Sequence, residues 1–381
     1  MRVAAFNVEN LFDRARVFGD DGEGLEGEVL DAHAELNRLF EQAVYTDDDK
    51  ARMLELIEAL GMLRRDEGRF VRIRKIRGQL ISRPRTRPTF IKANGRDDWI
   101  GWCELKTAPV DEVAMMNTAR MIRDARADVL AVVEAESRPV LKEFHDRVLS
   151  EVGVAPGQGY RHIMVIDGND GRGIDVGLAT REGFPIGTVR SHVDDLKEDG
   201  FPIFSRDCPE YEVTTALGNR LILLPNHFKS KFGGNDPSSR AKRLAQAEAV
   251  AGYYNRLLCE GFENIIVLGD LNDTPDSEEL APLLQDTDLK DISEHERFTA
   301  FEFNANNGHR GIGTHGLGND SDKIDYLLLS PALFGKVTLA GMERRGLWPG
   351  SRPPRWEVYP ELEKKHHRAS DHHLLWADID I

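Results

Sequence analysis

Short runs of aliphatic and β-branched residues recur along the whole chain, separated by polar and glycine-containing segments. Runs of about four to eight such residues are typical of strands that are buried on both faces of a sheet. The runs are Val3–Val8, Val129–Val133, His162–Ile166, Asp175–Thr180, Leu221–Leu224, Ile265–Leu268, Ile324–Leu329 and Leu375–Ile379. They predict strands from one end of the chain to the other.

Two segments repeat their apolar residues with the period of an α-helix instead. In Arg240–Leu258 the apolar positions recur at the spacing of successive helical turns, and Ser238 or Ser239 is the candidate N-cap. Asp111–Ala125 carries a shorter stripe of the same kind. Strands that alternate with helices over this length predict a layered α/β architecture.

The stretch 14–109 interrupts this pattern. It opens with a loop rich in glycine and acidic residues and continues with two helical candidates, Glu28–Val44 and Asp47–Leu63. Thr46 is a natural N-cap for the second helix. We therefore interpret 14–109 as a mostly helical insertion within a single domain that spans 1–381.

Charge is distributed unevenly along the chain. The net charge is −15, yet the segment 64–92 holds 11 basic and 2 acidic residues, so it carries +9 and the remainder carries −24. The acidic remainder argues against indiscriminate binding of polyanions, whereas the basic segment is a candidate arm for an anionic substrate. Pro84 and Pro88 restrict this segment to edge or extended structure. Trp99 and Trp102 follow it; they could stack on bases, but we favour the interpretation that they are buried anchors.

The three cysteines, Cys103, Cys208 and Cys259, are odd in number and widely spaced. They cannot build a disulfide framework or a CxxC zinc site, which favours a reducing, cytoplasmic location. No apolar run approaches the ~20 residues that a membrane span requires. Nothing in the sequence indicates an obligate protein partner.

Polar residues follow four of the predicted strands directly. They are Asn7, Glu134, the pair Asn226-His227, and Asp270. A single polar residue after a strand most often marks a solvated turn. However, strand ends in α/β sheets also open into the crevices where ligands bind, so the set as a whole is a candidate site.

The order of polar motifs resembles that of the endonuclease/exonuclease/phosphatase superfamily, the deoxyribonuclease I-like metal-dependent phosphoesterases. The matching positions are Asn7, Glu134, Arg172, His227, Asp270-x-Asn272, Asp325-Tyr326 and Ser370-Asp371-His372. Gly-Asp-Leu-Asn at 269–272 and Ser-Asp-His at 370–372 are the most specific of these. The resemblance covers almost the whole chain except the insertion. It implies a four-layer α/β/β/α sandwich with two packed mixed sheets, here with the basic insertion added to a catalytic domain.

The resemblance also implies a divalent cofactor, Mg²⁺ or Mn²⁺. Glu134 would be the principal metal ligand, with Asn7, Asp270, Asn272 and Asp371 as nearby second-site or outer-sphere ligands. Carboxylate and amide oxygens are the hard ligands that Mg²⁺ prefers. Asp270 would orient or deprotonate the attacking water, or protonate the leaving group; the sequence leaves these roles open.

The remaining matched residues would contact the substrate phosphate. His372 would bind the scissile phosphate, and Asp325 would fix its tautomer and raise its pKa. His227 and Arg172 would donate further hydrogen bonds to phosphate oxygens. Lys229 and Lys231 beside His227 also suit an anionic substrate.

Two other local patterns are weighed and set aside. Asp167–Gly171 looks like the start of a calcium loop, but Leu178 stands where an EF-hand requires a bidentate glutamate. The adjacent pairs His366-His367 and His372-His373 could indicate zinc. Neighbouring side chains of an extended chain diverge, however, and no HExxH motif or cysteine partner is present. We expect a single functional His372 with surface neighbours.

The leading hypothesis is a metal-dependent phosphodiester hydrolase that acts on nucleic acid and contacts it through the basic segment 64–92. A second hypothesis keeps the chemistry but changes the substrate to a small phosphorylated molecule or a phospholipid. It is motivated by the acidic remainder and by the lack of the tyrosine with which the family's repair endonucleases contact the phosphate. A third hypothesis is a non-catalytic binding module on the same fold.

Overall fold

The computed structural model describes most of the chain. The described residues are 1–9, 11, 17, 25–107, 111–170, 173–231, 236–300, 311–351 and 354–381. The chain forms two compact units: unit 1 comprises Met1–Phe12 and Asp111–Ile381, and unit 2 comprises Asp13–Val110. Unit 2 has nearly the bounds of the insertion 14–109; that both units belong to a single domain stays a prediction.

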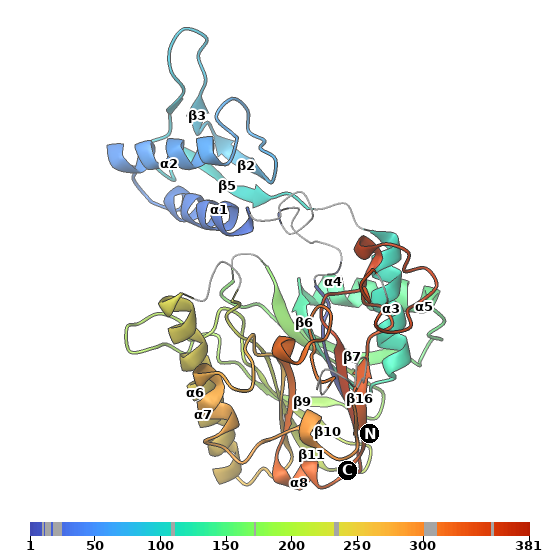
Figure 1. Cartoon of the computed structure of the whole chain (residues 1–381). Coiled ribbons are helices and arrows are strands. Elements are labelled where there is room, and N and C mark those ends of the chain that lie inside the picture. The colour runs from blue at the N-terminus through green and yellow to red at the C-terminus, as the bar shows by residue number, and fades with distance from the viewer. Residues whose placement is uncertain are drawn as a thin grey trace. The chain divides into compact units, whose positions relative to one another are not determined.

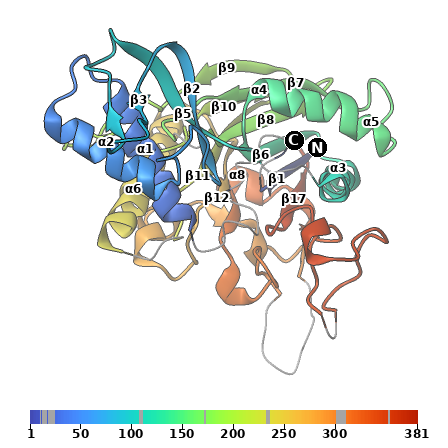
Figure 2. The same ribbon diagram turned by 90° about the horizontal axis from the view of Figure 1, so that it is seen from above.

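Within the described part of unit 1, seven strands form the first sheet, in the order β14-β16-β17-β1-β6-β8-β7. Their bounds are β14 Phe298–Thr299, β16 Val337–Glu343, β17 Leu374–Ile379, β1 Arg2–Asn7, β6 Val129–Ala135, β8 Asp175–Arg181 and β7 Tyr160–Ile166. β1 lies between β6, to which it is parallel, and β17, to which it is antiparallel. The two ends of the chain therefore lie close together, as Figures 1 and 2 show, and the amino group of Met1 donates a hydrogen bond to the carbonyl oxygen of Ile379 at 2.8 Å.

The second sheet has six strands among the described residues, in the order β13-β15-β12-β11-β10-β9. Their bounds are β13 Lys290–Asp291, β15 Asp325–Leu329, β12 Ile265–Asp270, β11 Arg220–His227, β10 Glu210–Thr214 and β9 Ile186–Arg190. β11 and β12 are parallel, and β15 runs antiparallel to β12, with Asp325 opposite Asp270. The carboxyl ends of β11 and β12 and the start of β15 consequently meet at one edge.

The two sheets pack face to face, and helices cover their outer faces. Aliphatic side chains from both sheets, such as Ala131 and Leu268, fill the core between them. Met121 of α3 (Glu112–Ala125) packs on the outer face of the first sheet, and Val250 of α6 (Pro237–Cys259) packs on that of the second. Figure 1 shows α6 on one side of the strands and α3 on the other. The prediction of a four-layer α/β/β/α sandwich is confirmed.

The shorter helices are α4 Arg138–Glu143, α5 Leu149–Glu151, α7 Ala281–Leu284 and α8 Pro331–Phe334. Of these, α4, α5 and α7 belong to the outer layers, whereas Leu333 of α8 packs into the core between the sheets. Seen from above in Figure 2, α4 and α5 lie on the side of α3, away from α6.

Aspartates cap both long helices of unit 1. Oδ1 of Asp111 accepts hydrogen bonds from the backbone N–H groups of Val113 and Ala114, and Asp236 caps α6 in the same way. The prediction that Ser238 or Ser239 caps α6 is therefore wrong. Pro237 occupies the first helical position, where its fixed φ suits the helix and its missing N–H is not needed, so both serines already lie in the first turn.

Unit 2 combines two helices with two small sheets. The helices α1 (Glu26–Phe40) and α2 (Asp47–Ala59) share a core with strand β5 (Trp99–Leu105) and strand β2 (Val71–Gly78). Thr46 caps α2 through a reciprocal hydrogen bond with Asp49, as the sequence predicts. The basic segment forms extended structure: β2 pairs with β5, and β3 pairs with β4. The bounds of the latter two are Ile81–Ser82 and Phe90–Ile91.

All eight predicted strands and both predicted helices of unit 1 are present. The strands that the sequence did not reveal include β9, β10 and β16. β9 and β16 are partly exposed. All three strands carry charged or small residues between apolar ones, so they do not form continuous apolar runs. No helix in the described ranges is both long enough and apolar enough to cross a bilayer.

Candidate active site

The strand directions gather the predicted site residues at one edge of the two facing sheets. β1 and β6 are parallel in the first sheet, and β11 and β12 are parallel in the second. Their carboxyl ends carry, in turn, Asn7, Glu134, His227 and Asp270. β15 and β17 run in the opposite direction, so Asp325 and the Ser-Asp-His segment lie at the same edge, at or just before their first residues. Residues that are hundreds of positions apart in the sequence thereby become neighbours.

Asn7 links the two sheets. Its side chain is 1% exposed, and its Nδ2 donates a hydrogen bond to Oδ2 of Asp270 at 3.2 Å. It also hydrogen bonds to the carboxylate of Glu134, while its Oδ1 accepts the backbone N–H of Glu9 at 3.1 Å. The bond from Glu9 fixes the orientation of the amide, so the NH₂ group faces the two carboxylates.

Glu134 sits at a backbone irregularity near the end of β6. The pairing register of β6 with β8 shifts between Val133 and Ala135, and Glu134 has a φ of 66°. A left-handed conformation is costly for glutamate, and β-bulges of this kind recur beside active sites, where they redirect a side chain. Here Oε1 of Glu134 lies 3.6 Å from Nε2 of His227, which is also 3.7 Å from Oδ2 of Asp270.

The Gly-Asp-Leu-Asn segment forms a tight turn at the end of β12. Oδ1 of Asp270 accepts the backbone N–H of Asn272 at 2.8 Å, and its Oδ2 accepts Nδ2 of the same asparagine at 3.1 Å. Gly269 has a φ of 117°, and a Cβ there would lie 2.2 Å from the backbone oxygen of Asn226. Only glycine fits that position, which explains why it precedes the aspartate.

The two central carboxyl groups resist ionisation. Burial raises the pKa of Asp270 to about 7, with the neighbouring Asp325 adding to the shift against the charge of His372. Burial likewise raises the pKa of Glu134, although the charges of His372 and Arg206 oppose the shift. Burial therefore makes the ionised form of both carboxyl groups costly unless a cation lies beside them.

His372 and Asp325 form a buried pair. Nδ1 of His372 donates a hydrogen bond to Oδ2 of Asp325 at 2.9 Å, and Nε2 lies 3.9 Å from Asp270 and 3.8 Å from Asp371. Burial disfavours the charged imidazole, but the charges of Asp325 and Asp270 outweigh it, so the pKa of His372 is raised well above its usual value. The Ser370 hydroxyl accepts the backbone N–H of His372 and donates to the carbonyl of Asn7, which ties this segment to β1.

Three further residues around Asp371 were not found from the sequence. Nε2 of His315 lies 3.7 Å from Asp371, and its ring is 4.9 Å from that of His372. Arg368 pairs with Glu9 at 2.7 Å and lies 3.5 Å from Asp371. Burial opposes ionisation of Asp371, yet the hydrogen bond to His315 and the charge of His372 hold its pKa well below its usual range. The backbone of His315 pairs with His372 through an isolated bridge outside the named strands, so no apolar strand before it marks its role.

Besides Arg368, Arg206 acts on this site through its charge. It is buried, pairs with Asp170 at 3.0 Å, and its charge acts on Glu134. The predicted Arg172 lies outside the described residues. Arg206 stands in a loop with no preceding apolar strand, so nothing in its local sequence indicates its position.

The structure separates the other candidates of the sequence. Lys231 pairs with the buried Asp273, so its charge is already engaged. His373 is completely buried against Trp356, so the expectation that it is a surface neighbour of His372 is wrong. It directly precedes the buried strand β17.

The donor set of this edge fits a divalent cation. Two buried carboxyl groups with raised pKa values, Glu134 and Asp270, share Asn7 and His227 as neighbours. Asp270, Asp325 and His372 also place one ligand atom each within 4.8 Å of one another. A hard cation would compensate the buried negative charge and remove the cost that raises both pKa values.

The chain is similar to a known family and to several solved structures. Residues 84–341 match the model of the Endonuclease/Exonuclease/phosphatase family. Among solved structures, truncated TDP2 from Caenorhabditis elegans has 18% identity, with 69% of this chain and 88% of that chain covered and a TM-score of 0.45. The mannosyl-6-phosphatase Bt3783 of Bacteroides thetaiotaomicron has 17% identity, covering 70% and 91%, with a TM-score of 0.48. The human Nocturnin catalytic domain with bound sulfate has 14% identity, covering 72% and 88%, with a TM-score of 0.47.

No curated protein matches the chain. The family match spans more than half of the sequence, although it begins after Asn7 and ends before Asp371, so those two positions rest on the geometry alone. The chain belongs to the endonuclease/exonuclease/phosphatase family.

Proposed function

We propose that this protein is a phosphodiester hydrolase that depends on Mg²⁺ or Mn²⁺ and acts on nucleic acid. The family is one of hydrolytic phosphoesterases. The observation that carries the proposal is the single buried edge at which Glu134 and Asp270 share Asn7 and face the His372–Asp325 pair. These groups are the ones that phosphoryl transfer to water requires.

Glu134 would be the principal ligand of the metal, with Asp270 and Asp371 nearby. Enzymes of this fold generally use divalent metals, and the bound cation supplies charge neutralisation of the phosphate and a lower pKa for water. Asn7 and Asn272 direct their NH₂ groups at the carboxylate of Asp270, so as arranged here they position the ligands. Serving as ligands themselves would require each amide to turn its oxygen inward.

The histidines would bind the scissile phosphate. Nδ1 of His372 donates to Asp325, and the raised pKa of His372 keeps a proton on Nε2 as well, so Nε2–H can donate to a phosphate oxygen. Nε2 of His227, between the two carboxylates, is placed to do the same. Asp270 would orient or deprotonate the attacking water, or protonate the leaving oxygen.

A substrate panel tests the proposal directly. Metal-stripped protein would be supplied with Mg²⁺ or Mn²⁺ and duplex DNA, single-stranded DNA, RNA, inositol phosphates or bis(p-nitrophenyl) phosphate. We expect metal-dependent cleavage of a nucleic acid, and we expect Glu134→Gln to lower the rate about a thousandfold and to weaken Mn²⁺ binding in calorimetry. Failure of the wild-type protein to cleave any nucleic acid would refute the nuclease assignment.

Unit 2 supplies the argument for nucleic acid. Trp99 is buried against Phe40, with ring centroids 4.8 Å apart, as expected of an anchor. Trp102 is 42% exposed and lies opposite Arg74 on the paired strand. An exposed indole flanked by arginine is the usual combination for stacking on bases and holding the backbone.

Substitutions in unit 2 distinguish a polymer from a small phosphoester. Arg72 and Arg74 both pair with Glu104, so the more exposed Lys75 and Arg85 are better targets. We expect Trp102→Ala combined with Lys75→Ala and Arg85→Ala to raise KM for nucleic acid about tenfold and to reduce its dependence on salt. The rate with bis(p-nitrophenyl) phosphate should not change, and Lys50→Ala in α2 is the matched control. An unchanged KM for nucleic acid would show that the basic segment 64–92 and Trp102 do not bind the substrate.

The strongly negative remainder of the chain favours the second candidate, a small phosphorylated molecule or a phospholipid. Outside 64–92 the chain carries −24, which disfavours long polyanions. In that case only the small phosphoesters of the panel would turn over. A protein that cleaves none of the substrates and binds no Mn²⁺ would instead be the non-catalytic module.

A reducing, cytoplasmic location also belongs to the proposal. Cys103 and Cys208 are buried, Cys259 is exposed, and all three thiols are free. Free thiols of this kind persist in reducing compartments.

A further inference from the structure

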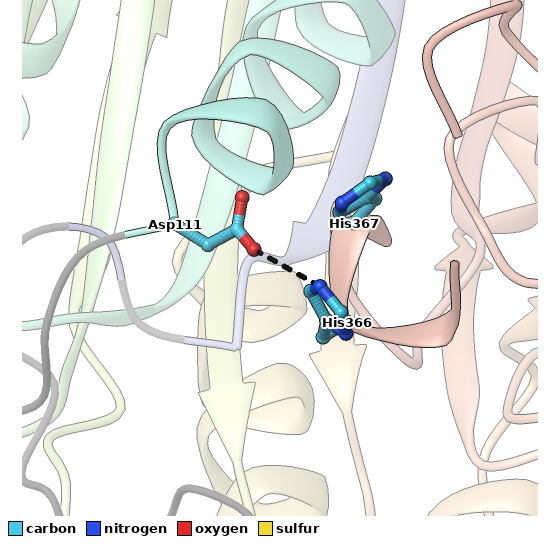
Figure 3. A group of neighbouring side chains, drawn as sticks. All are labelled: Asp111, His366 and His367. Carbon is cyan, nitrogen blue, oxygen red and sulfur yellow. Dashed lines mark ion pairs between the residues drawn. The ribbon is translucent and has the colours of Figure 1, made fainter. Parts of the chain in front are cut away.

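Three potential metal ligands of unit 1 lie together outside the candidate active site at the strand ends, which we call the strand-end site. They are Asp111, His366 and His367. One ligand atom of each lies within 4.8 Å of the other two. Figure 3 draws the three side chains. Nε2 of His366 is 3.9 Å from Oδ2 of Asp111. The sequence argued against zinc here because neighbouring side chains of an extended chain diverge. In the structure the histidines belong to a 3₁₀ helix, Lys365–His367, whose turn brings both rings to the same aspartate.

Two of the three ligands are held by a second contact. Oδ1 of Asp111 caps α3, which leaves Oδ2 for another partner. Nδ1 of His367 is 3.2 Å from the carbonyl oxygen of Glu361. Because a carbonyl oxygen can only accept, Nδ1 carries the proton, and the lone pair is on Nε2. Metal-binding histidines are typically oriented by such a bond.

Buried side chains of α3 also fix the two histidines relative to Asp111. Nδ2 of Asn117 donates a hydrogen bond to the carbonyl of His367 at 2.8 Å, and the hydroxyl of Thr118 donates to the carbonyl of Ala369 at 2.9 Å. Asn117 and Thr118 are 0% and 3% exposed. The aspartate and the 3₁₀ helix are therefore attached to the same rigid helix, so the three ligands keep their separation.

We propose that Asp111, His366 and His367 bind a late first-row divalent cation such as Zn²⁺. Ligand atoms about 2.1 Å from a tetrahedral ion are about 3.4 Å apart, so modest side-chain rotations would close the present distances. Two imidazoles and one carboxylate select Zn²⁺, Cu²⁺ or Ni²⁺ over Mg²⁺. His366 is half exposed, so water can complete the coordination.

The site is independent of the proposed reaction, and neighbouring charges limit its affinity. The positive end of α3 and the adjacent Lys365 both repel a cation. Soft, imidazole-based coordination tolerates this better than purely electrostatic binding of Mg²⁺ does.

Zinc counting tests the inference. Metal-stripped full-length protein would be dialysed against Zn²⁺ in excess Mg²⁺, and bound zinc would be measured by atomic emission for the wild type, His366→Ala, Asp111→Ser and Lys365→Ala. Serine keeps an N-cap oxygen and removes the carboxylate. We expect the affinity of one zinc site to fall tenfold or more in the first two variants and to stay at the wild-type value or higher in Lys365→Ala.

A fourth variant separates this site from the strand-end site. His315→Ala removes an imidazole from the group around Asp371 and His372, and the difference between His366→Ala and the wild type should persist in its background. Thermal unfolding followed by circular dichroism would confirm that each variant is folded. Equal zinc binding by the wild type, His366→Ala and Asp111→Ser would overturn the proposal, as would an equal loss in Lys365→Ala.

Discussion

Two buried histidines of unit 1 pair with carboxylates, but they are used differently. His372 at the strand-end edge hydrogen bonds to Asp325 through Nδ1 alone. His192, beside the second sheet, uses both nitrogens: Nδ1 contacts Asp195 at 2.9 Å and Nε2 contacts Glu210 at 2.6 Å. The ring of His192 also stacks on Tyr253, with centroids 3.7 Å apart.

The difference lies in the second nitrogen. Over the described ranges, Nε2 of His372 has no hydrogen bond and faces Asp270 and Asp371 across gaps of 3.9 and 3.8 Å. Nε2 of His372 can therefore donate to a phosphate oxygen or water that approaches it, whereas His192 has no donor left to offer. A raised histidine pKa, which both residues share, therefore does not by itself identify a functional group.

The largest contrast should appear in activity. We expect His372→Gln to lower kcat about a thousandfold, because a donor to the scissile phosphate is lost, while glutamine can still hydrogen bond to Asp325. His192→Gln should leave kcat within about twofold but should lower the free energy of unfolding by about 2 kcal/mol, because one charged hydrogen bond and the stacking on Tyr253 are lost. Steady-state kinetics and urea unfolding of both variants measure the two effects. A loss of activity in His192→Gln that matches the loss in His372→Gln would erase the distinction.

The sequence pointed to His372 and was silent about His192. Ser-Asp-His is a local motif through which the chain resembles the endonuclease/exonuclease/phosphatase family, and that resemblance implied a role for His372 before the fold was known. His192 depends on Glu210 and on Tyr253 of α6, contacts that only the tertiary fold creates. The main strands were predictable for the same local reason, since strands buried on both faces form continuous apolar runs.

The residues that escaped sequence analysis have no such local signature. His315 and Arg206 lie in loops, and each gains its neighbours through packing between distant segments. The sequence treated residues 366 and 367 as extended chain, whereas the backbone there is a 3₁₀ helix. Local motifs thus pointed to candidate groups at the strand ends, while the loop residues became candidates only through the fold.

Substitution of the carboxylates that pair with the two histidines should also affect activity differently, but by less. We expect Asp325→Asn to lower kcat about a hundredfold with little change in KM, because an amide cannot hold His372 in the charged, correctly oriented form. Asp195→Asn, the matched change beside His192, should leave both constants unchanged. The kinetic constants of the two variants, measured with one substrate, check this. A rise in KM without a fall in kcat would show that Asp325 serves binding and not the orientation of His372.

The smallest expected effect is the dependence of stability on pH that His192 contributes. Burial disfavours its charged form, but hydrogen bonds to Glu210 and Asp195 outweigh burial and raise its pKa above 6.5. A neutral imidazole could donate to only one of these carboxylates, so the folded protein retains the proton more strongly than the unfolded chain does.

The stabilisation is therefore complete below the unfolded pKa and is lost as the pH rises through the higher folded pKa. The difference in unfolding free energy between the wild type and His192→Gln should be larger at about pH 6 than at about pH 9. Urea unfolding at both pH values measures it, with Tyr253→Phe as a control that keeps the histidine. If the difference instead grew with pH, His192 would be neutral in the fold, and its likeness to His372 would be limited to geometry.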